Sequence, residues 1–163
     1  MSLDAFYLQY HPLIFAVHIF AAIIWIGGMI AFSLTVYPSL EQIPNEKMFV
    51  RTALRTLNRF FRLLIPVSLL GGISGFMLAM GKDFAHRDPV LSVVVTSKEF
   101  IWLFMLLLYL YAFYKIKEAR SACLASNSEA ARDNVKLIAW YLFGVSVLLG
   151  SSAVYFGYLL RGV

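Results

Sequence analysis

The fold of this chain is decided by one stretch, which runs from residue 12 to residue 37 and reads PLIFAVHIFAAIIWIGGMIAFSLTVY. It contains no Asp, Glu, Lys or Arg, and it exceeds the roughly 20 residues that a helix needs to cross a bilayer. Pro12 suits the first turn of a helix, and Pro38 ends the run. We therefore expect a transmembrane helix over residues 12–37.

The composition of the whole chain agrees with a lipid environment. Of its 163 residues, 61% are hydrophobic and 14% are charged, and the mean hydropathy is +0.76. Soluble domains are about 25% charged, so an ordinary soluble enzyme and a disordered chain are both excluded. The start of the chain lacks the positive segment of a cleavable signal peptide, and we expect none. The single cysteine, Cys123, excludes an intramolecular disulfide and an all-cysteine metal site.

Three further apolar runs follow the first one, and they predict spans at about 63–81, 99–115 and 137–160. The third run is short unless Lys98 reaches the membrane interface with its long side chain. The four runs predict an all-α integral membrane protein, a four-transmembrane-helix bundle that occupies residues 1–163 as a single domain. Its expected surroundings are the lipid bilayer, and nothing indicates binding of nucleic acid.

The basic residues indicate the direction of the spans. The chain carries 14 Lys and Arg residues, and ten of them lie in the segments after the first and third spans. These ten are Lys47, Arg51, Arg55, Arg59, Arg62, Lys115, Lys117, Arg120, Arg132 and Lys136. The positive-inside rule places both segments in the cytoplasm. We therefore expect a multi-pass protein of a bacterial inner membrane, with both termini in the periplasm.

Residues 46–62 are predicted to form a helix with one basic face. Arg51, Arg55, Arg59 and Arg62 recur at spacings of four, four and three, which places them on the same side of a helix. Such a face can lie against anionic lipid headgroups. Alternatively, Arg59 or Arg62 binds a carboxylate, such as a porphyrin propionate.

His18 is the clearest candidate for a functional residue, because ionisable groups inside a span are costly. Trp25 lies one heptad later, and Ala21, Ala22 and Gly28 share the same helix face. Small residues allow a second helix to approach closely, so we expect His18 to point into the bundle. There it can act as a ligand or a proton relay, or simply form a hydrogen bond.

A metal site is one use for His18. His11 at the outer end of the first span, and His86 in the outer loop after the second, are expected on the same side of the membrane. Met77 and Met80 end the second span on that side. Imidazole and thioether groups are copper ligands. One of His11 and His18, together with His86 and a methionine, could therefore bind copper.

Haem is the competing cofactor, because imidazole also binds haem iron. In that case His18 is the ligand, and Arg59 or Arg62 and Lys98 hold carboxylates. Lys98 and Glu99 begin the third span, where such a pair can also be an interface anchor.

The pattern around His18 resembles two known families. His18, Trp25 and the pair Gly27-Gly28 are similar to the first span of the membrane domain of the copper-resistance protein D family. A weaker similarity connects the same pattern with the membrane protoporphyrinogen oxidases of haem synthesis. The resemblance continues through the arginine-rich segment, Pro66 and the glycines of the second span to Lys98.

What these resemblances imply is an inner-membrane protein that handles copper or a haem. The oxidases carry a second histidine in the third span. The corresponding position here is near Tyr109, and the span contains no histidine.

Three functions follow as expectations. The first is copper binding or copper handling at a site around His18. The second is a redox protein that binds b-type haem or a porphyrin and is similar to protoporphyrinogen oxidase or linked to quinone. The third is a structural subunit of a membrane complex, and the small-residue faces would also suit a homo-oligomer. The sequence contains no phosphate-binding loop, paired zinc motif or nucleophile elbow. These motifs therefore do not decide whether the protein is an enzyme.

Overall fold

The computed structural model describes residues 3–81 and 89–159, and the regular structure of these residues is helical. It comprises four rods. The first joins α1 (Leu3–Ala31), the π-helical segment η1 (Phe32–Val36) and α2 (Tyr37–Glu41); the second is α3 (Glu46–Gly81); the third is α5 (Pro89–Leu124); the fourth joins α6 (Ser128–Lys136), the π-helical segment η2 (Leu137–Leu142) and α7 (Phe143–Leu159). Each rod is long and apolar enough to cross a membrane. The prediction of an all-α four-span bundle is confirmed, and the protein is a multi-pass integral membrane protein.

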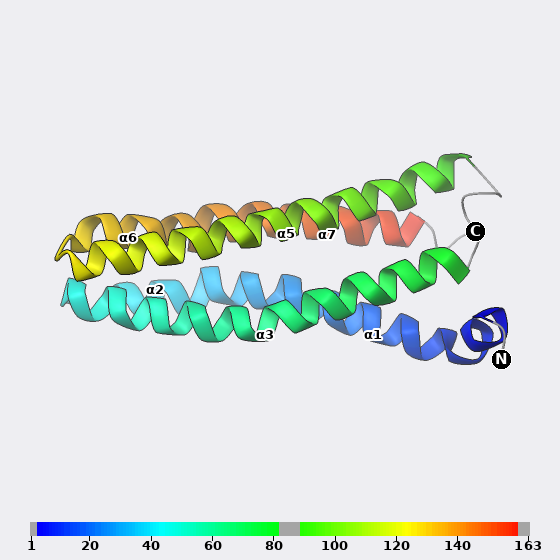
Figure 1. The fold of residues 1–163 in the computed structure, drawn as a ribbon, viewed down its shortest axis with the longest axis horizontal. Coiled ribbons are helices and arrows are strands. Elements are labelled where there is room, and N and C mark those ends of the chain that lie inside the picture. Colours follow the sequence, from blue (N-terminus) through cyan, green and yellow to red (C-terminus); the bar gives the residue numbers. More distant parts are fainter. Residues whose placement is uncertain (1–2, 82–88, 160–163) are drawn as a thin grey trace.

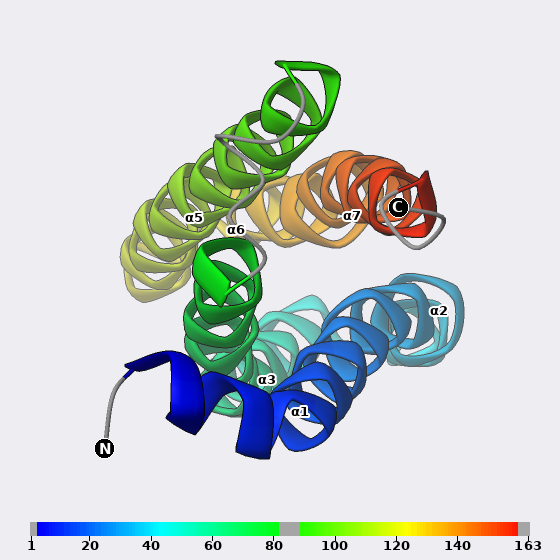
Figure 2. The same cartoon turned by 90° about the vertical axis from the view of Figure 1, so that its right-hand side faces the viewer.

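Successive rods run antiparallel to one another along the long axis of the bundle (Figure 1). Residues 42–45 and 125–127 turn the chain at one end of the bundle, which we call the loop end. The chain starts α1 and finishes α7 at the opposite end, which we call the terminal end (Figure 1). The first rod packs against α3 and α7, and α5 packs against α3 and α7 (Figure 2). Near the loop end, α6 also packs against α3. The helix faces turned away from these contacts are open to lipid.

The helices are longer than the apolar runs. Residues 46–62 are helical, as predicted, and continue without a break into the second span. Asn45 starts this helix, because its side-chain oxygen accepts a hydrogen bond from the Met48 N–H at 2.9 Å. The third helix begins at Pro89, so Lys98 and Glu99 lie within it rather than at its start. Lys and Glu have good helix propensity, so they interrupt the apolar run without interrupting the helix.

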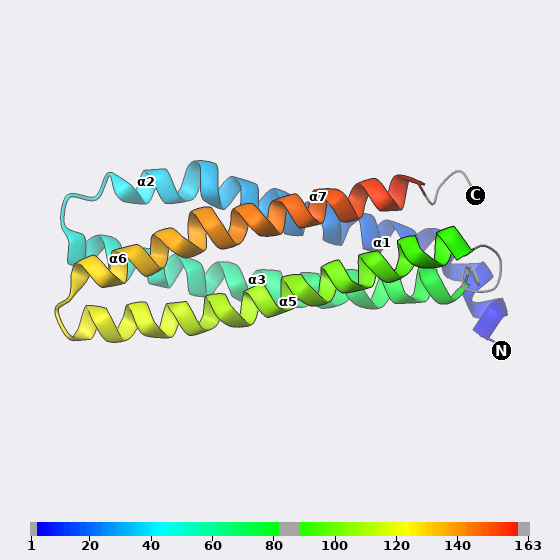
Figure 3. The ribbon, with the colours of Figure 1, turned by 90° about the horizontal axis from the view of Figure 1, so that it is seen from above.

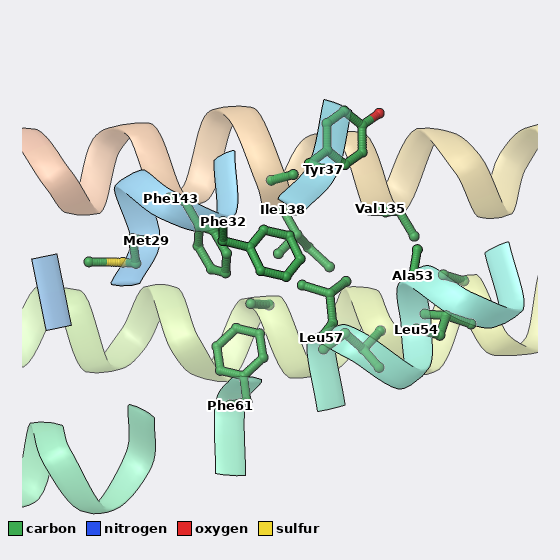
Figure 4. Close-up of a cluster of buried hydrophobic side chains, with 14 of the residues drawn as sticks. Met29, Phe32, Tyr37, Ala53, Leu54, Leu57, Phe61, Val135, Ile138 and Phe143 are labelled. Carbon is green, nitrogen blue, oxygen red and sulfur yellow. The ribbon is translucent and has the colours of Figure 1, made fainter. Parts of the chain in front are cut away.

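The densest packing lies in the half of the bundle toward the loop end. There, Phe32, Phe61 and Phe143 are at most 2% exposed, and their rings contact one another with centroid separations of 5.3 Å for Phe32–Phe143 and 5.8 Å for Phe61–Phe143. Figure 4 shows these rings meeting between the helices, beside buried aliphatic side chains. The Ser33 hydroxyl donates a hydrogen bond to the Ala139 carbonyl oxygen at 2.6 Å, and so connects η1 with η2.

In the half of the bundle toward the terminal end, glycines allow the helices to approach closely. A Cβ on Gly71 would lie 3.4 Å from the Ala21 Cβ, and one on Gly150 would lie 2.8 Å from Ile26 Cγ1. The first contact joins α3 to α1. The second joins α7 to α1, which it crosses in Figure 3. Toward this end α5 diverges from α3 (Figure 1). The small residues of the second span therefore serve helix packing, as their spacing predicts.

Candidate cofactor site

His18 lies on α1 and is bound to the backbone of α3. Its Nδ1 lies 3.0 Å from the Gly71 carbonyl oxygen and 3.3 Å from Ser74 Oγ. A carbonyl oxygen can only accept a hydrogen bond, so Nδ1 carries the proton and donates it. Ser74 directs its own proton to the Leu70 carbonyl at 2.6 Å. In the neutral ring Nε2 therefore keeps its lone pair, the atom with which a histidine binds a metal.

Gly75 makes room for the imidazole. A Cβ at this position would lie 2.9 Å from His18 Cε1, which is closer than real Cβ contacts, and 3.3 Å from Nδ1. Gly72, on the neighbouring side of α3, accommodates the ring of Trp102 in the same way. Trp102 also donates from Nε1 to the Ser68 carbonyl at 3.2 Å. The glycines therefore let two large rings, one from α1 and one from α5, pack directly on the α3 backbone.

Lys98 reaches the same half of the bundle from α5. Its side chain is half-buried, and its Nζ lies 3.2 Å from the position of a Cβ on Gly157 of α7. The ammonium acts electrostatically on the His18 ring. Within residues 3–81 and 89–159, no carboxylate forms an ion pair with Lys98, and Glu99 is exposed. A positive charge without an anionic partner therefore lies near His18.

Trp25 lies deeper along the same face of α1, beside Tyr109 of α5. It is 7% exposed, and its ring centroid is 5.7 Å from that of Tyr109. The indole N–H of Trp25 is buried and has no hydrogen-bond partner among residues 3–81 and 89–159. The Tyr109 hydroxyl donates to Met29 Sδ, a weak acceptor, at 3.9 Å. An unsatisfied buried donor costs about 1–3 kcal/mol, so this point of the core would gain from a polar atom.

The remaining predicted metal ligands are more scattered. His11 is half-buried and stacks on Phe15 with a centroid separation of 6.4 Å. Met77 is half-buried, whereas Met80 is 62% exposed. His86 lies outside the described residues. In the part of the chain that the structure describes, no group of three or more His, Cys, Asp or Glu could hold a metal ion.

Arg59 and Arg62 belong to a second feature, which we call the basic groove. This groove of about 610 Å³ is lined by residues of the first half of α3 and the last turns of α5. These parts of the two helices lie toward the loop end (Figure 1). Its cationic lining residues are Lys47, Arg51, Arg55, Arg59, Arg62 and Arg120. Arg62 precedes Gly71 by nine residues, about 14 Å along a helix. The structure therefore brings together His18 and Lys98, and places Arg59 and Arg62 elsewhere.

The sequence singled out His18 and the glycines but not their connection. Ser74 and the Gly71 carbonyl, which hold the ring, were not identified as site groups. Every residue has a backbone carbonyl, so the sequence does not show which carbonyl accepts the hydrogen bond. The available signal was the recurrence of Gly71, Ser74 and Gly75 at helical spacing opposite a histidine-bearing helix.

This fold and site define a multi-pass membrane protein with a half-buried histidine of one helix hydrogen-bonded to the backbone of another. No protein-family model matches the chain, and searches of the curated proteins and of the solved structures give no significant match. The resemblance to the copper-resistance and porphyrin-oxidising families therefore rests on the short residue pattern alone.

Proposed function

We propose that the half of the bundle toward the terminal end binds b-type haem or a related porphyrin, with His18 as the iron ligand. The observation that carries this proposal is the hydrogen bond from His18 Nδ1 to the Gly71 carbonyl, at 3.0 Å. Metal-binding histidines almost always donate their second ring N–H to a carbonyl or carboxylate, which orients the ring and makes the other nitrogen more basic. The His18 ring is already held in this way.

The charge near His18 favours an anionic cofactor over a bare metal cation. The Lys98 ammonium acts on His18 and forms no ion pair with the described carboxylates. A copper ion bound near this ammonium would be repelled by it, whereas a porphyrin propionate would be attracted. Lys98 is therefore the proposed partner of a carboxylate.

A polar contact is open deeper along the same face of α1. Gly72 and Gly75 are covered by the rings of Trp102 and His18, which pack on the α3 backbone. The buried N–H of Trp25 has no partner in the described part of the chain and offers a hydrogen bond. A bound haem would supply one-electron transfer chemistry. His18 would hold the porphyrin through its iron, and Lys98 would balance the negative charge of a propionate.

Copper is the second candidate, and Met77 is the observation in its favour. Met77 is half-buried. It lies one helical turn after Ser74, whose hydroxyl is 3.3 Å from His18 Nδ1. Imidazole and thioether together suit copper. This alternative also needs His86, or another ligand, to approach His18.

The bacterial inner membrane, with both termini in the periplasm, is the proposed location. The basic groove opens at the loop end, where both predicted cation-rich segments also lie. The positive-inside rule assigns that end to the cytoplasm. The His18 site then belongs to the periplasmic half of the membrane.

Absorption spectroscopy tests the proposal. Protein purified in detergent from haem-replete cells should show a Soret band, with sharpened α and β bands after dithionite reduction. The His18→Ala variant should lose this spectrum, and His11→Ala should keep it. A colourless protein with stoichiometric copper would contradict the haem proposal and support copper binding. A colourless, metal-free protein would leave His18 with a structural role and contradict both.

A further inference from the structure

The basic groove is distinct from the His18 site and carries charge that the described protein does not neutralise. Six cations line it, and no Asp or Glu does. None of the six takes part in an ion pair among residues 3–81 and 89–159. Like charges one turn apart on a helix repel one another. The groove therefore presents a concentrated positive potential to whatever anion lies beside it.

The opposite face of α3 fixes the position of these cations. Phe49, Ala53 and Leu57 are at most 2% exposed and belong to the core near the loop end. Arg51, Arg55, Arg59 and Arg62 are exposed on the other side of the same helix turns. Core packing thus holds the backbone of the basic face in place, so little backbone ordering is needed when a ligand binds.

The basic face of α3 continues as an apolar face along the same side of the helix. From Arg62, steps of three and four residues lead through Pro66 to Leu69, Ile73 and Phe76. These last three side chains are 47%, 60% and 58% exposed. One side of α3 is therefore cationic over its first half and apolar over its second. An anionic phospholipid has the same two parts, a charged headgroup and apolar acyl chains.

We propose that the basic groove binds the headgroup of an anionic phospholipid, whose acyl chains lie along Leu69, Ile73 and Phe76. Guanidinium groups bind phosphate oxygens with paired hydrogen bonds. Basic recesses between transmembrane helices suit such headgroups. Six cations exceed the charge of one phosphate, so a lipid with two phosphates, such as cardiolipin, should bind more tightly than phosphatidylglycerol. This inference does not depend on the cofactor at His18.

Cys123 provides a built-in reporter, because this half-buried residue lines the groove and is the only cysteine of the chain. The experiment uses the full-length protein, delipidated in detergent, and measures the rate of maleimide alkylation of Cys123. Cardiolipin, phosphatidylcholine and inorganic pyrophosphate are titrated separately. Native mass spectrometry of the same samples counts the lipids that stay bound.

We expect cardiolipin to slow alkylation and to remain bound, and phosphatidylcholine and pyrophosphate to do neither. The double variant Arg59→Gln/Arg62→Gln should weaken cardiolipin binding about 30-fold, since each basic side chain near an anionic lipid contributes about 1 kcal/mol. The matched control Lys117→Gln/Lys136→Gln removes two exposed cations that do not line the groove. It should bind cardiolipin like the unaltered protein.

Three results would overturn the proposal. Equal protection by phosphatidylcholine would show that acyl chains alone bind there. Equal protection by pyrophosphate would identify a soluble phosphate ligand instead of a lipid. Undiminished cardiolipin binding in Arg59→Gln/Arg62→Gln would place the lipid elsewhere. If that double variant does not fold, Arg120→Gln tests the α5 side of the groove with the same readouts.

Discussion

His18 Nδ1 donates a hydrogen bond to the Gly71 carbonyl oxygen, 3.0 Å away and 53 residues later in the chain. This bond joins a side chain of α1 to the backbone of α3 at a point where both helices are apolar. This bond orients the imidazole and, in the neutral ring, places the proton on Nδ1 and the lone pair on Nε2. Three predictions concern this site, and a fourth concerns the packing of the other half of the bundle.

Substitution of Gly75 tests whether the ring needs the glycine. In Gly75→Ala the new methyl group would lie 2.9 Å from His18 Cε1, so the imidazole must move away from α3. Overpacking of this kind costs about 1–3 kcal/mol. We expect a lower thermal midpoint in detergent and, if haem is bound, a shifted or lost Soret band. Gly27→Ala is the matched control, because nothing lies within 4 Å of a Cβ at Gly27. Equal effects of the two substitutions would contradict the assigned contact.

Removal of His18 separates its structural role from a ligand role. In cofactor-free protein, His18→Ala should lower the free energy of unfolding by about 1 kcal/mol, the net value of one hydrogen bond. The loss stays small because the Ser74 hydroxyl also lies within hydrogen-bond distance of the Gly71 carbonyl, at 3.1 Å. Equilibrium unfolding in mixed detergent measures it. A loss several times larger would show that the histidine is mainly a packing residue, whereas unchanged stability with lost pigment would support the ligand role.

The charge of Lys98 should govern cofactor retention. Lys98→Gln keeps the length and polarity of the side chain but removes the charge that would pair with a carboxylate. We expect the haem content of the purified protein to fall, and Lys98→Arg to restore much of it. Lys117→Gln serves as the control, since Lys117 is an exposed cation on the same helix. Full haem content in Lys98→Gln would remove Lys98 from the proposed site.

The bond between the two π-helical segments should contribute to stability. The Ser33 hydroxyl is buried and donates to the Ala139 carbonyl at 2.6 Å. Ser33→Ala should therefore destabilise the protein by about 1 kcal/mol. Ser152→Ala removes a hydroxyl that is exposed and bonded within its own helix, to the Leu148 carbonyl, and should change little. If thermal unfolding does not distinguish the two variants, the Ser33 bond contributes nothing measurable.

The membrane spans could be predicted from the sequence because lipid imposes a local rule. A segment that crosses the bilayer must be apolar and must satisfy its backbone groups within itself, so length and composition identify it. The helix over residues 46–62 was predicted from the spacing of four arginines, which recur on one face of a helix. Helix lengths were harder. Lys98 and Glu99 break the hydropathy of the third span, but not its backbone hydrogen bonding, and the helix begins at Pro89.

The sequence by itself determined the class of this protein, the existence of its four helices and the inward direction of His18. Each of these depends on residues close together in the chain. Only the tertiary structure decided that His18 meets Gly71, that Lys98 lies on the same side, and that Arg59 and Arg62 line a separate groove. Those relationships depend on the rotation and offset of one helix against another. Many small packing contacts set that register together, and no single stretch of sequence encodes it.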